Sequence, residues 1–179
     1  NCLFGDPTTA KELPLIDAAA VCGCEYYVID AGWYAPGEWW DSVGEWKECR
    51  DRFPNGIKEV TDYIRKKGMV PGVWLELEVM GINCEKAKKA PDDWFFVRHG
   101  KRVYDRSRYQ LDFRNPAVIE HVNEVIDRVV KEYGVGYIKM DYNIEPGIGT
   151  EIGAESVGQG LLEHEKAYLN WLDGVFARY

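Results

Sequence analysis

Four carboxylates follow short apolar runs of this chain, where a strand would end. They are Asp30, Glu76, Glu78 and Asp141. Hydrolysis of a glycosidic bond needs carboxylates of this kind, one as nucleophile or base and another as acid. A single carboxylate at such a position often caps a helix or pairs with Lys or Arg. Several that converge on one edge favour a catalytic site.

Aromatic and cationic side chains accompany these carboxylates. Trp74 and Lys139 lie in the same apolar runs, and aromatic residues make up 13% of the chain. Four tryptophans fall within fourteen residues: Trp33, Trp39, Trp40 and Trp46. A pyranose ring stacks its apolar face on an aromatic plane, and its hydroxyls need polar groups around the rim. The pattern is typical of a sugar site, although aromatic clusters more often form a core or an interface.

The apolar runs are the elements that must position these groups. Residues 26–30, 70–76 and 136–141 each follow a segment with helical spacing of apolar residues. Nearly continuous apolar strands that alternate with amphipathic helices predict an α/β fold with a parallel sheet covered by helices. Because parallel strands end at one edge, we expect the carboxylates to lie together there.

Helix-boundary residues support this order of elements. Thr8 or Thr9 is suited to cap the first helix, and Gly23 is suited to end it. Pro116 is suited to the first turn of a long helix that ends near Gly134. The sequence therefore predicts a helix before each strand.

Three further segments fall outside this alternation. Residues 1–4 are expected to form a fourth strand, and residues 94–104 a hairpin around His99 and Gly100. Residues 161–176 have the spacing of a closing helix. A hairpin between the second and third strands would be an insertion into the α/β order.

Charge and length exclude several function classes. The formal net charge of −8 disfavours electrostatic binding of nucleic acid or an anionic membrane. No apolar run approaches the roughly 18 residues of a membrane span. The glycines after Asp141 lack a phosphate-binding fingerprint, so no cofactor is expected. The chain has 179 residues, fewer than the roughly 250 of a (β/α)₈ barrel.

The five cysteines are odd in number and form no CxxC pair, and no His stands at ligand spacing from them. Neither a metal site nor a complete disulfide framework is therefore expected. Reduced thiols in a cytoplasmic protein are the simpler interpretation. A pairing of Cys49 with Cys84 stays open at this point.

Five segments in order resemble the α-galactosidases of glycoside hydrolase family 36. They are residues 27–33 (YVIDAGW), 53–57 (FPNGI), 68–78 (GMVPGVWLELE), 108–116 (RYQLDFRNP) and 137–143 (YIKMDYN). The resemblance implies a (β/α)₈ barrel, a retaining mechanism and α-galactoside substrates, whose oligosaccharides would be the carbohydrate partner.

Roles follow from the resemblance position by position. It implies that Asp141 is the nucleophile that forms a covalent glycosyl intermediate. It implies sugar-binding roles for Asp30, Trp33, Trp74, Arg108, Lys139 and Asn143. Lys139 precedes Asp141 by two residues and so shares its side of the strand, where its charge should keep Asp141 ionised. Of Glu76 and Glu78, we expect at most one to meet sugar and the other to bind a neighbouring Lys or Arg.

Two departures from the family pattern shape the expected function. Ala31 stands where the family usually has a second aspartate, so another α-glycoside, such as an α-N-acetylgalactosaminide, is an alternative substrate. The family's general acid/base lies on the sixth barrel strand, to which no residue of this chain corresponds. A non-catalytic carbohydrate-binding module is a further alternative.

These departures predict which part of a catalytic domain the chain forms. Residues 1–179 are expected to be the N-terminal half of a (β/α)₈ catalytic domain, with strands one to four and an inserted hairpin. Such a fragment should be inactive alone. Its unpaired sheet edges favour a homodimer.

Overall fold

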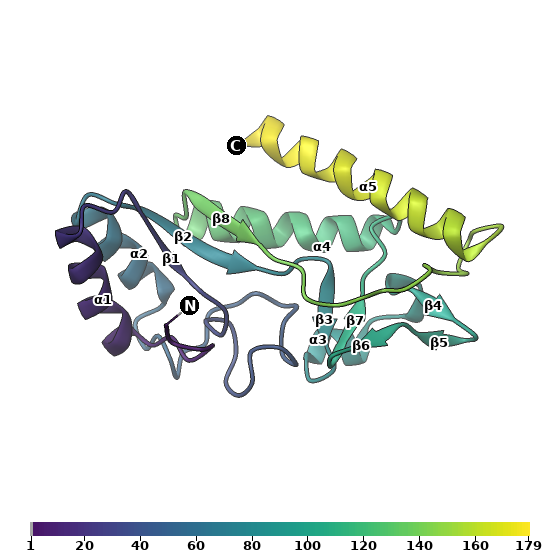
Figure 1. The fold of residues 1–179 in the computed structure, drawn as a ribbon, viewed down its shortest axis with the longest axis horizontal. Coiled ribbons are helices and arrows are strands. Elements are labelled where there is room, and N and C mark those ends of the chain that lie inside the picture. The colour runs from purple at the N-terminus through teal and green to yellow at the C-terminus, as the bar shows by residue number, and fades with distance from the viewer. Residues whose placement is uncertain (1) are drawn as a thin grey trace.

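A computed structural model describes residues 2–179, and its centre is a three-stranded parallel sheet (Figure 1). The strand order is β1-β2-β8, with β1 at Tyr26–Ile29, β2 at Val70–Leu75 and β8 at Tyr137–Met140. In register, β2 pairs Val73 with Ile29 on one side and with Ile138 on the other. The three predicted strands and their parallel arrangement are confirmed.

Helices precede each of these strands, as predicted. They are α1 (Thr9–Val21), α2 (Ile57–Lys66) and α4 (Pro116–Asp127), which continues as a π-helical turn η2 (Arg128–Glu132), and the chain closes with α5 (Val157–Arg178). Thr8 caps α1 by accepting a hydrogen bond from the Lys11 N–H, and Asn115 caps α4 in the same way. Gly23, just after α1, has a φ of 75°, which suits glycine at a helix end.

Between β2 and α4 the chain forms a small antiparallel region, at the far end of the molecule from α1 and α2 (Figure 1). One sheet has the order β3-β7-β6, from Val79–Gly81, Arg108–Gln110 and Tyr104–Asp105. The predicted hairpin is present as β4 (Val97–Arg98) and β5 (Lys101–Arg102). Two short helices complete the region, α3 (Glu85–Lys89) and η1 (Asp92–Trp94).

The expected fourth strand is not formed. Residues 2–5 are a turn, in which Phe4 and Gly5 have φ values of 48° and 79° and the Asp6 N–H donates to the Leu3 carbonyl. Residue 1 lies outside the described part of the chain. A left-handed pair of residues cannot continue a strand, and Phe4 is exposed rather than packed in a sheet.

Half of the tryptophan cluster, Trp33 and Trp46, lies in the core together with Trp74. The side chains of Trp33, Trp46 and Trp74 are 0 to 2% exposed, and their rings pack at centroid distances of 5.8 to 6.1 Å where they meet. Cys49 and Cys84 are also buried, as separate free thiols. Within residues 2–179, no helix is long and apolar enough to cross a membrane.

Candidate active site

The predicted carboxylates follow the strands of the parallel sheet at one edge. Asp30 comes directly after β1, Glu76 after β2 and Asp141 after β8. The Asp141 backbone N–H donates to the Leu75 carbonyl at 2.8 Å, which extends the β2–β8 ladder by one step. Because the pairing between β2 and β8 continues to Asp141, the sheet fixes the backbone position of this residue.

Two hydrogen bonds orient the Asp141 carboxylate. The Trp74 indole Nε1 donates to Oδ2 at 2.8 Å, and the Tyr142 backbone N–H donates to Oδ1 at 3.0 Å. Trp74 is 1% exposed, so its ring is fixed by packing. The sugar-binding role implied for Trp74 stays a prediction, and in this structure the polar edge of its ring holds the candidate nucleophile.

The surroundings favour the ionised form of Asp141. Burial alone would raise its pKa, but the hydrogen bond from Trp74, the nearby Asn143 carboxamide, the Tyr142 N–H and the charge of Lys139 together lower the pKa below its usual value. Lys139 lowers the pKa of Asp141, as expected. The hydrogen bond from Trp74 lowers this pKa more than the charge of Lys139 does. Asp141 is therefore an anion at neutral pH.

Lys139 and Asp30 form a second charged pair at this edge. Lys139 Nζ lies 3.5 Å from Asp30 Oδ2, and Asp30 Oδ1 accepts a hydrogen bond from the Ala31 N–H at 2.8 Å. The Lys139 side chain is 42% exposed and that of Asp30 21%. The sheet thus places a cation and a second carboxylate where both reach solvent.

Glu76 is used inside the protein. Its Oε2 lies 2.9 Å from Arg108 Nε, with side chains 0% and 2% exposed, and its Oε1 accepts the Asn143 N–H at 2.7 Å. Burial raises the pKa of Glu76, against the opposing charge of Arg108. One glutamate of the pair was expected to bind an arginine, and Glu76 does. Glu78 instead lies 3.4 Å from His164 Nε2.

A cavity of about 390 Å³ opens beside this ion pair. It is lined by Trp39, Trp40, Arg106, Ser107, Arg108 and Asn143. Arg108 Nη2 and Asn143 Nδ2 are buried and have no hydrogen-bond partner of acceptable geometry. Both side chains carry N–H groups, so this side of the cavity presents donors suited to a ligand with acceptor oxygens.

Trp33 lies behind the site rather than on its surface. Its side chain is 0% exposed, and its Nε1 donates to the Trp74 carbonyl at 2.9 Å. In this structure Trp33 supports the strand that carries Trp74 and does not reach the cavity. A position four residues after a strand end does not by itself determine which way an indole points.

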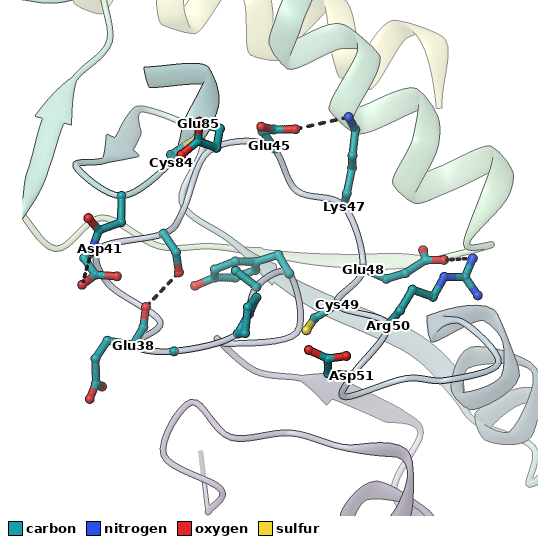
Figure 2. A pocket seen from close by; sticks show the side chains of 16 residues that line it. Glu38, Asp41, Glu45, Lys47, Glu48, Cys49, Arg50, Asp51, Cys84 and Glu85 are labelled. Atoms are coloured by element: carbon teal, nitrogen blue, oxygen red, sulfur yellow. Dashed lines mark hydrogen bonds and ion pairs between the residues drawn. The ribbon is translucent and has the colours of Figure 1, made fainter. Parts of the chain in front are cut away.

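A larger hollow of about 720 Å³ lies elsewhere, in the loop after β1 (Figure 2). Its labelled side chains are mostly acidic, and Lys47 and Arg50 pair with Glu45 and Glu48 there. None of the seven predicted site residues lines this hollow. The smaller cavity, which Arg108 and Asn143 line, is therefore the better candidate for substrate.

Comparison with known proteins shows to which family the chain belongs. Residues 2–176 match the family described as Melibiase, which is nearly the whole sequence. The chain belongs to the Melibiase family. The resemblance to family 36 α-galactosidases noted from its motifs is thereby confirmed.

Curated relatives of this Melibiase chain are α-galactosidases by name. It is 32% identical over 157 residues to alpha-galactosidase AgaA of Geobacillus stearothermophilus, covering 86% of this chain and 21% of that protein. It is 26% identical to alpha-galactosidase Mel36A of Lactobacillus acidophilus, covering 92% of this chain and 23% of the relative. The chain thus spans about a quarter of the length of these relatives.

Solved structures agree with the fold of the Melibiase chain. The crystal structure of the GH36 alpha-galactosidase AgaA matches with a TM-score of 0.84 at 25% identity, covering 98% of this chain and 25% of that one. The GH36 alpha-galactosidase AgaB, from the same organism, gives the same values. The α/β arrangement is therefore that of part of a GH36 catalytic domain.

Some residues that line the candidate cavity escaped sequence reasoning. Trp39, Trp40, Arg106 and Ser107 all line the cavity. The two tryptophans belong to a cluster that the composition makes conspicuous. Arg106 and Ser107 carry no signal of their own, because the turn between β6 and β7 joins strands of only two and three residues.

Proposed function

We propose that this chain contributes the nucleophile side of a retaining α-galactosidase active site. The observation that carries the proposal is the Asp141 carboxylate, held by the Trp74 indole at 2.8 Å and kept anionic. An ionised carboxylate in a fixed orientation at a strand end is suited to attack an oxocarbenium-like carbon. The named α-galactosidase relatives supply the substrate class.

In this mechanism an Asp141 oxygen bonds to the anomeric carbon of the sugar while the bond from that carbon to the aglycone oxygen breaks. A general acid protonates the departing oxygen. The same residue, now a base, then removes a proton from water, which attacks the anomeric carbon and releases Asp141. Two inversions give net retention of configuration.

Neighbouring groups are suited to hold the sugar hydroxyls. Arg108 and Asn143 line the cavity with N–H donors, and Lys139 and Asp30 present a cation and a carboxylate. A sugar hydroxyl both donates and accepts, so it can satisfy either kind of group. Each hydrogen bond to a charged group contributes about 1.5 to 3 kcal/mol, enough to orient the ring against Asp141.

The acid/base has no counterpart among these residues. Retaining enzymes place their two carboxyl groups about 5 to 5.5 Å apart. Glu76 is tied to Arg108 and Glu78 lies against His164. We therefore assign the acid/base to chain outside the 179 residues, which would form half of a (β/α)₈ barrel. The chain alone should have no turnover, and its exposed β1 and β8 edges should favour a homodimer.

Stereochemistry tests this function. The full-length protein is incubated with 4-nitrophenyl α-galactoside, and the first-formed galactose anomer is followed by proton NMR. We expect the α anomer first, loss of turnover by at least about a thousandfold in Asp141→Asn, and no effect of Asp62→Asn on exposed α2. A β product, or an active Asp141→Asn variant, would contradict the mechanism. Turnover by the 179 residues alone would contradict the division of the site.

A further inference from the structure

The chain leaves the parallel sheet directly after the candidate nucleophile. Residues 142–146 form neither helix nor strand, so no regular pairing fixes their backbone. Yet the Tyr142 backbone N–H donates to Asp141 Oδ1 at 3.0 Å. We propose that Tyr142 is a positioning residue for Asp141, and that the hydrogen bond from its side chain to buried Gln110 holds this N–H in place. The inference rests on the proposed function.

Gln110 provides a rigid anchor for Tyr142. It is the last residue of β7, it is 0% exposed, and it pairs with Val79 of β3. The Phe96 N–H also donates to the Gln110 carbonyl at 2.9 Å. The carboxamide Nε2 donates to the Leu111 carbonyl at 3.1 Å, and its Oε1 accepts the Tyr142 hydroxyl at 2.7 Å. Both polar atoms of the carboxamide are therefore used, which fixes the plane of the group.

The Tyr142 hydroxyl is suited to be the donor in this bond. Burial, and then the charge of Glu78, raise the pKa of Tyr142 well above its usual range, so the hydroxyl is protonated at neutral pH. The buried Gln110 oxygen in turn needs a donor, because an unpaired buried acceptor costs free energy. The two groups satisfy each other, and their bond joins β7 to the residue that follows Asp141.

Further contacts hold the backbone beyond Tyr142. Arg106 Nη1 donates to the Asn143 carbonyl at 3.1 Å, and Asp105 Oδ2 accepts the Glu145 N–H at 3.0 Å. Like Gln110, these two side chains come from the antiparallel region between β2 and α4, toward which the chain after β8 runs (Figure 1). This insertion into the α/β order therefore holds the segment that follows the nucleophile.

Two donors on two different oxygens control the direction of attack. With the Trp74 bond to Oδ2 alone, the carboxylate could turn about that contact, whereas the Tyr142 N–H on Oδ1 fixes its plane. Covalent attack depends steeply on the alignment of the reacting atoms. Neither Tyr142 nor Gln110 lines the cavity beside Arg108. Loss of the bond between them should therefore slow attack by Asp141 without weakening the binding of the sugar.

The rate of covalent labelling measures this effect directly. The full-length protein reacts with 5-fluoro-α-galactosyl fluoride: an Asp141 oxygen bonds to the anomeric carbon, and the carbon–fluorine bond there breaks as fluoride leaves. At saturating reagent the rate constant reports attack, and the final label per chain counts folded sites. We expect Tyr142→Phe and Gln110→Met each to lower the rate constant about tenfold, because one fixing hydrogen bond is lost. Final labelling and the half-saturating concentration of reagent should not change.

Two further variants separate positioning from stability. The double variant Tyr142→Phe, Gln110→Met should react as slowly as either single variant, because both changes remove the same bond. Tyr168→Phe removes another tyrosine hydroxyl, which lies 3.8 Å from Met140 Sδ, and should leave the rate constant as it is. A misfolded fraction of any variant lowers the final label but not the rate constant of the folded remainder.

The possible results distinguish the two claims. Wild-type rate constants in Tyr142→Phe and Gln110→Met, whatever their final labelling, would overturn the inference. A double variant whose loss is the product of the two single losses would overturn it as well. A wild-type protein that takes no label at Asp141 would instead overturn the proposed function.

Discussion

The Trp74 indole nitrogen donates a hydrogen bond of 2.8 Å to the Asp141 carboxylate, across the boundary between β2 and β8. An aromatic residue in a sugar site is usually assigned to stacking. Here the ring is buried and its polar edge points at the candidate nucleophile. The bond therefore fixes the direction of Asp141 and is the largest of the contacts that lower its pKa.

Removing this bond should shift the pH dependence of activity. In Trp74→Phe the ring face remains but the donor is lost, so the pKa of Asp141 rises. Because the nucleophile must be ionised, the acidic limb of kcat/KM against pH should move to higher pH. Activity at neutral pH should fall about tenfold, the equivalent of about 1.5 kcal/mol.

Trp46→Phe is the matched control for Trp74→Phe. In the wild type, the centroid of the Trp46 ring lies 5.8 Å from that of Trp74 in the same buried cluster. None of the described hydrogen bonds of Trp46 reaches Asp141. The variant should alter stability without moving the acidic limb. An equal shift of the acidic limb of kcat/KM in both variants would show that packing, not the hydrogen bond, lowers the pKa of Asp141.

Variants of the buried Glu76–Arg108 pair distinguish its effect on stability from its effect on activity. Arg108→Met leaves the Glu76 carboxylate buried without its cation, which should cost about 3 to 5 kcal/mol in the free energy of unfolding. The double variant Arg108→Met, Glu76→Leu should regain most of that stability. It should not regain activity, since the Arg108 donor for substrate is still missing. A double variant with normal turnover would remove Arg108 from the site.

Buried His121 should make stability fall in acid. Its Nδ1 accepts a hydrogen bond from Lys86 Nζ at 2.8 Å and its Nε2 bonds the Gly44 carbonyl at 2.8 Å. Burial, and then the charge of Lys86, lower its pKa from 6.5 to about 4. The unfolded chain therefore binds a proton that the folded chain does not, between pH 6.5 and about 4. Stability is complete above pH 6.5 and decreases by about 3 kcal/mol as pH falls through that range.

Thermal unfolding at several pH values measures this effect. The difference between wild type and His121→Gln should shrink as pH falls from 7 to 4, because only the wild type loses the contribution of His121. His99→Gln, which removes an exposed imidazole, is the control. A constant difference between wild type and His121→Gln across the range would contradict the lowered pKa.

Continuous apolar strands and clear helix boundaries made the parallel sheet predictable. Thr8 and Pro116 begin their helices as expected, since capping depends on local chemistry. The β3-β7-β6 sheet was not predictable, because strands of two or three residues carry no alternation pattern. Residues 2–5 form a turn although they look apolar, since two left-handed residues interrupt them.

The candidate site, like the fold, was predictable from the sequence only in part. The strand-end position of Asp141 follows from the alternation of strands and helices, and its partner Lys139 follows from the two-residue period of a strand. Side-chain directions beyond the strand ends depend on packing. For that reason Trp74 is a hydrogen-bond donor to Asp141, and Trp33 is buried behind it.

Covalent trapping tests most directly whether Asp141 is the nucleophile. The full-length protein is incubated with 5-fluoro-α-galactosyl fluoride, which forms the glycosyl intermediate but slows its hydrolysis, and then analysed by intact mass and peptide mapping. We predict one sugar per active site, attached to the peptide that contains Asp141, and no label in Asp141→Asn. A label on Asp30 or Glu76, or none in a protein that still turns over α-galactosides, would contradict this assignment.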